Sequence, residues 1–177
     1  KVITTTIPPR PWGSRDYDDY GTMVTHLRQP DGSWKFDYTI FDRYVEFALS
    51  CGITQQINCY SMLTWSGRLD YTDAATGDTR WTMSEPGSPE FADYWGPFLK
   101  DFEKHLGAKG WLERTRLAVD EAPAPMMKAM MALVRANAPH LKAALACNQA
   151  PSHYTGLDVA DFTIILDHAS DDLLRDI

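Results

Sequence analysis

Short β-branched or apolar stretches alternate with amphipathic stretches along this chain, and this alternation restricts the possible folds more than any other feature. Helical spacing of apolar residues separates the first four strand-like stretches from one another. A helix between two successive strands is the usual crossover of a parallel pair. The sequence therefore predicts an α/β fold with a parallel sheet of about five strands, at residues 1–7, 53–60, 114–119, 142–147 and 159–166.

The expected helices have recognisable starting residues. The first is predicted from Thr39, which we expect to cap it together with Asp42. The second is predicted from residue 88 to about residue 110, because a serine and a proline stand at its start. A methionine-rich helix is predicted over residues 126–137, with its methionines in the core. A short terminal helix is expected after Ser170.

Two long connections follow the first two strands. Residues 8–38 are rich in Pro, Gly, Asp and Tyr and are predicted to be irregular, with one short strand at 23–27. Residues 61–87 are predicted to contain a hairpin around the turn at 75–78. Connections of this length inside a compact domain are usually functional.

A doubly wound sheet and a (β/α) barrel both fit this order of elements. No Gly-x-Gly-x-x-Gly follows the first strand, so a dinucleotide-binding sheet lacks support. The aromatic connections follow strand ends, where barrel enzymes build their active sites. Five strands are too few to close an eight-stranded barrel. We therefore expect residues 1–177 to be a single domain, a fragment of a (β/α)8 TIM-type barrel from a longer protein.

Composition excludes several classes of partner. The net charge of −7 and a pI near 5.1 argue against nucleic acid, which needs clustered Lys and Arg. No apolar run approaches the ~20 residues that span a bilayer. The cysteines Cys51, Cys59 and Cys147 lack the spacing of a zinc site, and we interpret them as small buried side chains. The sequence predicts no metal and no cofactor.

Aromatic residues make up 12% of the chain, and several lie in loop-like sequence. The apolar face of a sugar ring can stack on an indole, so Trp65 and Trp81 are candidate sugar contacts. The alternative is that both side chains pack against the rim of the fold. Asn58 and Tyr60, at the end of the second strand, are further candidates for substrate binding.

His153 and Tyr154 follow the fourth strand and are candidates for hydrogen bonds to a sugar hydroxyl.

Asp120 and Glu121 stand where the third strand is predicted to end. Two close carboxylates disfavour each other's ionisation, so the pKa of one of them rises and that group can act as an acid. Paired carboxylates at a barrel mouth are typical of glycoside hydrolysis. The alternative is a solvated loop pair, or charges that precede the next helix.

The residues around Asp120 and Glu121 favour the catalytic interpretation of this pair over a solvated loop pair. The chain resembles the catalytic region of glycoside hydrolase family 123, the β-N-acetylgalactosaminidases. The resemblance covers residues from about 30 to 170. It is carried by Phe36-Asp37-Tyr38, Phe41-Asp42-Arg43-Tyr44-Val45, Cys51-Gly52-Ile53, Gly87-Ser88-Pro89-Glu90, Phe98-Leu99, His105-Leu106, Lys109-Gly110-Trp111 and Asp120-Glu121-Ala122-Pro123.

This resemblance implies a retaining hydrolase of β-linked N-acetylgalactosamine in which the 2-acetamido group of the substrate attacks the anomeric carbon. It maps Glu121 to the general acid/base and Asp120 to the residue that orients the acetamide. The family usually has proline directly after this pair, whereas Ala122 intervenes here. The resemblance also implies a bacterial, periplasmic or secreted protein with a glycan or amino-sugar substrate.

Two further interpretations remain open from the sequence. The chain could be a carbohydrate-binding barrel domain without turnover, or a structural domain whose loop aromatics are packed. The preference for galacto or gluco sugars, the linkage, the glycan type, the activity of this fragment alone and the oligomeric state are not determined by the sequence.

Overall fold

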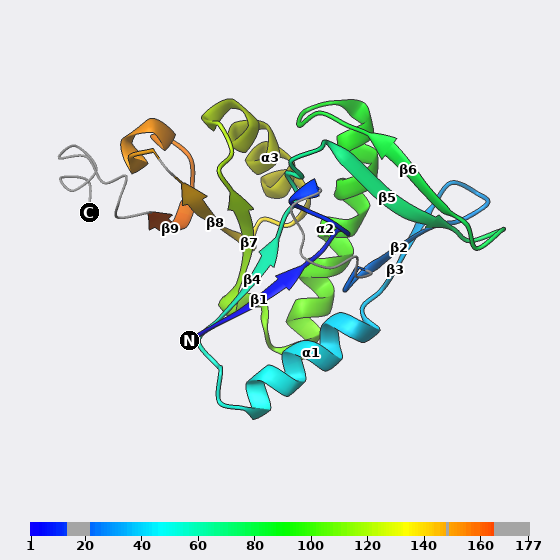
Figure 1. Cartoon of the computed structure of the whole chain (residues 1–177), viewed down its shortest axis with the longest axis horizontal. Helices are drawn as coiled ribbons and strands as arrows, with labels where there is room; N and C mark the ends of the chain where they lie inside the picture. The colour runs from blue at the N-terminus through cyan, green and yellow to red at the C-terminus, as the bar shows by residue number, and fades with distance from the viewer. Residues whose placement is uncertain (14–21, 148, 165–177) are drawn as a thin grey trace.

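Five parallel strands form the main sheet of the protein. The computed structural model describes residues 1–13, 22–147 and 149–164. The strands occur in the order β1-β4-β7-β8-β9, which is also their order along the chain (Figure 1). Their bounds are Val2–Thr6 for β1, Gln56–Tyr60 for β4, Thr115–Asp120 for β7, Lys142–Cys147 for β8 and Val159–Ile164 for β9.

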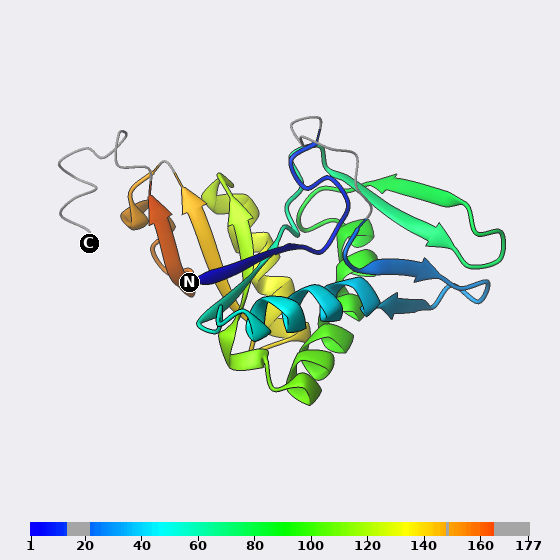
Figure 2. The ribbon, with the colours of Figure 1, turned by 60° about the horizontal axis from the view of Figure 1, so that its bottom comes forward.

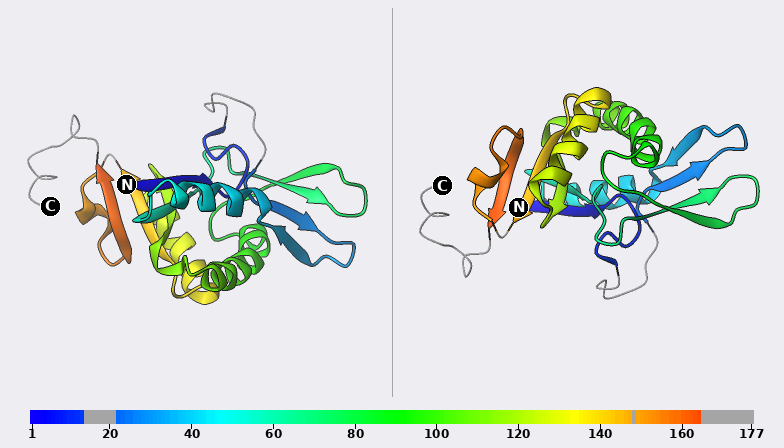
Figure 3. Two further views of the ribbon diagram at one scale, coloured as in Figure 1. Left: turned by 90° about the horizontal axis from the view of Figure 1, so that it is seen from below. Right: turned by 90° about the horizontal axis from the view of Figure 1, so that it is seen from above.

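Three helices connect the first four of these strands. They are α1 (Thr39–Ser50), α2 (Pro89–Lys109) and α3 (Ala124–Asn137). In Figure 3 they follow one another along one side of the curved row of strands. A doubly wound sheet would reverse its strand order and carry helices on both faces. The sequential order and the one-sided helices are those of a singly wound sheet.

The predicted α/β class and the parallel sheet of five strands are therefore confirmed. The barrel stays a prediction, because β1 and β9 form the two edges of the sheet and the described strands do not close. Between β8 and β9 the chain forms a short 3-10 helix, η3 (Pro151–Tyr154), and a second one, η2 (Leu112–Arg114), precedes β7. The terminal helix expected after Ser170 lies outside the described residues.

The core lies between the main sheet and the helices. Ile57, Leu117 and Leu145, one from each of the strands β4, β7 and β8, are each at most 1% exposed. The predicted apolar stripe of α2 faces them, and each of its side chains is at most 2% exposed: Phe91, Trp95, Phe98, Leu99 and Phe102. Burying one such side chain contributes roughly 1.5–3 kcal/mol. Of the α3 methionines predicted to lie in the core, Met127, Met130 and Met131 are buried, whereas Met126 is partly buried against it.

A second, four-stranded sheet in the order β3-β2-β5-β6 lies at the end of the molecule away from β9 (Figures 1 and 2). Its strands are β2 (Thr25–Arg28), β3 (Trp34–Asp37), β5 (Arg68–Asp73) and β6 (Thr79–Met83). The predicted hairpin is confirmed in β5 and β6. The strand expected at 23–27 is found two residues later, and the sequence did not indicate β3.

The small sheet packs on α2 around His26. The His26 ring is 2% exposed and stacks on Tyr94 with 4.5 Å between ring centres. Neither ring nitrogen has a hydrogen bond of normal geometry, and only a weak contact with the Val24 backbone favours the charged form. Burial therefore lowers the pKa of His26 to about 3, so this ring is neutral at ordinary pH.

The helix caps agree only in part with those predicted from the sequence. Ser88 caps α2 as predicted, because its Oγ accepts the Phe91 N–H at 3.1 Å. The capping predicted for α1 is wrong. Asp37 accepts hydrogen bonds from Thr39 N–H at 2.9 Å and from Thr39 Oγ1 at 2.6 Å. Asp42 instead contacts Nε2 of His105 and Nζ of Lys109, at 2.7 Å and 2.8 Å.

Candidate active site

Asp120 and Glu121 lie together at the carboxyl end of β7. Asp120 is the last residue of the strand, and its side chain is on the face of the sheet that the helices leave open. The Glu121 N–H donates to the Ala146 carbonyl at 2.8 Å, which extends the pairing with β8 by one residue. Glu121 then has φ of 50°, a left-handed conformation that is strained for a residue other than glycine. Such strained residues gather at functional sites.

The turn at Glu121 lets both carboxylates face the same space. They line one pocket of about 320 Å³ together with Leu63, Trp65 and Met126, among other residues. Trp65 comes from the connection after β4, and its backbone N–H donates to the Pro11 carbonyl at 2.9 Å. Trp65 is 43% exposed and lies beside the carboxylates. The pocket is at the lower end of the size range of small-molecule sites.

The surroundings of Asp120 raise its pKa. Partial burial is the main cause and the neighbouring Glu121 charge adds to it, whereas a hydrogen bond from Trp12 acts in the opposite direction. Because the Trp12 indole N–H can only donate, this bond favours the ionised carboxylate. The net effect is a raised pKa for Asp120.

Tyr60 is the neighbour of Asp120 on the adjacent strand. Because β4 and β7 are parallel, their carboxyl ends meet at one edge of the sheet. Tyr60 pairs with Ala118, two residues before Asp120, so Tyr60 and Asp120 share a face. Burial and the Asp120 charge both raise the pKa of Tyr60, which keeps its hydroxyl neutral and able to donate. The Trp12 ring lies 5.5 Å from the Tyr60 ring, centre to centre.

Trp12 is a site residue that the sequence analysis missed. It lies in the connection that follows β1, and β1 is parallel to β4. The available signal was an aromatic residue shortly after the first strand, at the same end of the sheet as Tyr60 and Asp120. Trp12 lies within residues 8–38, which are predicted to be irregular, and its position after the first strand was therefore not used.

Tyr154 has a different environment from the one expected. Its side chain is 3% exposed, and its hydroxyl donates to the Ala122 carbonyl at 3.1 Å. It therefore holds the backbone directly after the carboxylate pair and does not reach the pocket. His153 is exposed on η3 and has Nδ1 3.2 Å from the Ala150 carbonyl oxygen.

The other two candidates lie apart from the carboxylates. Asn58 is on the open face of β4, and its Oδ1 accepts from Gln56 Nε2 at 2.9 Å. Trp81 lies on β6 of the small sheet, 55% exposed, and is not among the residues that line the carboxylate pocket. The structure thus brings Asp120, Glu121, Tyr60 and Trp65 together and leaves Trp81 on a separate surface.

Metal and membrane features were sought in the residues that the structure describes. No group of three or more His, Cys, Asp or Glu side chains there is arranged to hold a metal ion. No helix in the described ranges is both long and apolar enough to cross a membrane.

Comparison with known proteins identifies the family. Among solved structures, the chain is similar to a family 123 glycoside hydrolase from Clostridium perfringens, reported with the details of glycolipid glycan hydrolysis. The TM-score is 0.87 and the sequence identity 28%, over 97% of this chain. The chain spans 32% of the length of that structure. The curated proteins gave no significant match. The sequence model described as glycoside hydrolase 123, catalytic domain, matches residues 1–176, and the chain therefore belongs to glycoside hydrolase family 123.

Proposed function

We propose that this chain provides the working carboxylates of a retaining β-N-acetylgalactosaminidase that uses the 2-acetamido group of its substrate as the nucleophile. The observation that carries the proposal is the position of Asp120 and Glu121 in one pocket at the carboxyl edge of the sheet, beside the exposed Trp65. Membership of family 123 supports glycoside hydrolysis as the reaction class. The similar Clostridium perfringens enzyme makes a glycolipid glycan a reasonable substrate to test.

In the first step, the acetamide oxygen of the substrate attacks the anomeric carbon as the bond to the leaving oxygen breaks. Glu121 donates its proton to that oxygen, and Asp120 accepts a hydrogen bond from the acetamide N–H. Water then attacks the cyclic intermediate and gives a proton back to Glu121, so the β configuration is retained. Glu121 is exposed in the free protein, so its carboxyl group can reach the oxygen of the leaving group.

Asp120 suits the orienting role. Its pKa is raised by burial and by the Glu121 charge, which makes it a strong hydrogen-bond acceptor once it is ionised. The Trp12 hydrogen bond favours the ionised form of this carboxylate. Trp65 can then stack on the sugar ring, and the neutral Tyr60 hydroxyl can donate to the substrate.

The test compares Glu121→Gln and Asp120→Asn on two β-N-acetylgalactosaminides, one with a nitrophenyl and one with an alkyl leaving group. The protein should be used at its full natural length. A general acid contributes about 10² to 10⁴ in rate. A nitrophenolate leaves without protonation, so Glu121→Gln should lose far more activity on the alkyl glycoside. Asp120→Asn should lose similar amounts on both substrates.

Glu113→Gln is the matched control, since Glu113 precedes β7 at the opposite end of the strand and is 88% exposed at its side chain. It should retain wild-type rates. Full activity of Glu121→Gln on the alkyl glycoside would refute the assignment. Sugar binding without turnover by the wild-type protein would favour a carbohydrate-binding domain instead.

A further inference from the structure

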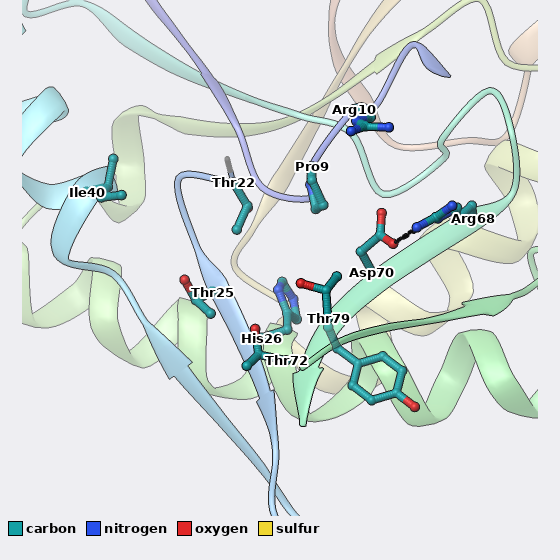
Figure 4. Close-up of a pocket in the computed structure, with 11 residues that line it drawn as sticks. Pro9, Arg10, Thr22, Thr25, His26, Ile40, Arg68, Asp70, Thr72 and Thr79 are labelled. Carbon is teal, nitrogen blue, oxygen red and sulfur yellow. Dashed lines mark hydrogen bonds and ion pairs between the residues drawn. The ribbon is translucent and has the colours of Figure 1, made fainter. Parts of the chain in front are cut away.

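A second pocket, separate from the carboxylates, lies on the outer face of the small sheet (Figure 4). Its volume is about 470 Å³, larger than that of the carboxylate pocket. Pro9 and Arg10, from the segment after β1, form one side of it. The sheet forms the other side, and Figure 4 shows Asp70 joined to Arg68 there. None of the residues assigned above to the reaction lines this pocket.

The strand register places Trp81 on the same face as this pocket. In the antiparallel pair of β5 and β6, Asp70 is opposite Trp81 and Thr72 is opposite Thr79. Directly opposed residues have their side chains on the same face of a sheet. Asp70, Thr72 and Thr79 line the pocket. Trp81 therefore extends the pocket surface along β6.

The polar groups of this surface are arranged to bind hydroxyl groups. Asp70 Oδ1 accepts from Arg68 Nε at 2.8 Å and from Arg68 Nη2 at 2.6 Å, which fixes the carboxylate. Its second oxygen, Oδ2, makes no hydrogen bond within the described residues. The same holds for the hydroxyls of Thr72 and Thr79, so three oxygen atoms on this face remain able to bind a ligand.

Trp81 supplies an aromatic surface next to these groups. The indole is 55% exposed, and the Arg68 guanidinium lies 5.2 Å from its ring centre. Aromatic rings carry much of the energy of molecular recognition. Together with a fixed carboxylate and free hydroxyls, Trp81 offers a flat apolar ring and hydrogen-bond partners, the two features of a sugar. The ion pair with Arg68 largely offsets the negative charge of Asp70.

We infer that this surface, formed by Asp70, Thr72, Thr79 and Trp81, binds a neutral sugar unit, and that this unit belongs to the same glycan that enters the carboxylate pocket. The residues between the two pockets support that connection. Trp65 lines the carboxylate pocket, whereas Ser66, Arg68 and Arg10 line a hollow of about 170 Å³ that also includes Asp70. The second part of this inference rests on the proposed function, and the first part does not.

The test uses Trp81→Ala and Asp70→Asn in the protein at its full natural length. Rates are measured on an aryl β-N-acetylgalactosaminide and on a neutral tetrasaccharide that ends in the same sugar. A hydrogen bond to a charged group, or a lost aromatic contact, corresponds to about tenfold to hundredfold in affinity. Each variant should raise KM for the tetrasaccharide by that factor. Activity on the aryl glycoside should change by less than about twofold.

Arg80→Ala is the matched control. Arg80 is next to Trp81 on β6 but is opposite Tyr71, so its side chain is on the other face of the hairpin. It should behave as wild type on both substrates. Equal losses on both substrates in Trp81→Ala, or no loss on either, would overturn the inference.

A binding measurement separates this inference from the proposed reaction. The tetrasaccharide is titrated calorimetrically into Glu121→Gln and into Glu121→Gln combined with Trp81→Ala. Weaker binding in the double variant supports the second site even if no hydrolysis is ever detected, in which case only the proposed function fails. Equal binding by the two proteins refutes the second site, whatever the rates of hydrolysis are.

Discussion

Replacing Glu121 by glycine should stabilise the protein while removing its activity. The left-handed conformation of Glu121, with φ of 50°, costs an L-residue roughly 1–2 kcal/mol. Alanine at this position keeps that cost, whereas glycine avoids it and loses about 0.5–1 kcal/mol in chain entropy. Both variants remove the repulsion between Glu121 and Asp120. Glu121→Gly should therefore be about 1 kcal/mol more stable than Glu121→Ala.

Urea unfolding measures this difference directly, and it corresponds to roughly 2–4 °C in Tm for a chain of this size. The control is the same pair of substitutions at Glu113, which lies in η2 and does not have a positive φ. There the order should reverse, because glycine brings only its entropy cost. If Glu121→Ala were instead more stable than Glu121→Gly by about 0.5–1 kcal/mol, as expected at Glu113, the backbone at the carboxylate pair would store no strain.

Three further predictions follow from single contacts. Tyr154→Phe should lose about 1–3 kcal/mol of unfolding free energy, because the Ala122 carbonyl loses its donor, whereas Tyr44→Phe on the surface should be nearly neutral. Trp12→Phe removes a bond that favours ionised Asp120, so the acidic limb of the pH profile of kcat/KM should move to higher pH; an unmoved limb would contradict this. Unfolded His26 titrates near 6.5 but the folded residue titrates at about 3, so stability falls as the pH drops through that window. His26→Phe should lose that part of the acid sensitivity, as measured by urea midpoints at pH 7 and pH 4.

Much of the fold could be predicted because local patterns determine it. The β-branched stretch at 1–7 and the stripe of α2 are periodic, and periodicity fixes which side of an element is buried. Ser88 and the turn at 75–78 act through neighbours in sequence, so both were predicted correctly. Asp42 was misassigned because His105, 63 residues away, competes for its carboxylate. The strand β3 was missed because it is short and depends on pairing with β2.

The candidate site also has some features that the sequence predicted and others that only packing determines. The sequence placed Asp120 and Glu121 at the end of a parallel strand, and the structure has them there. The left-handed turn at Glu121 and the Trp12 hydrogen bond come from the packing of neighbouring strands and loops, which the sequence does not display. Trp65 and Trp81 lie in the same predicted connection, and no feature of the sequence separates them as candidate sugar contacts. Their separation depends on the path of the connection after β4, which brings one tryptophan to the carboxylates and carries the other out on a hairpin.

The sequence by itself determined the α/β class, the order of strands and helices, and the carboxylate pair at a strand end. These features depend on residues close to one another in the chain, whose burial follows the period of a strand or a helix. Only the tertiary structure decided which side chains meet. The hydroxyl of Tyr154, a predicted sugar contact, instead donates to the Ala122 carbonyl. The tertiary structure also places Trp12 beside Asp120 and Trp81 beside Asp70. Such meetings depend on strand register and loop paths, because residues distant in sequence are brought together only by the packed fold.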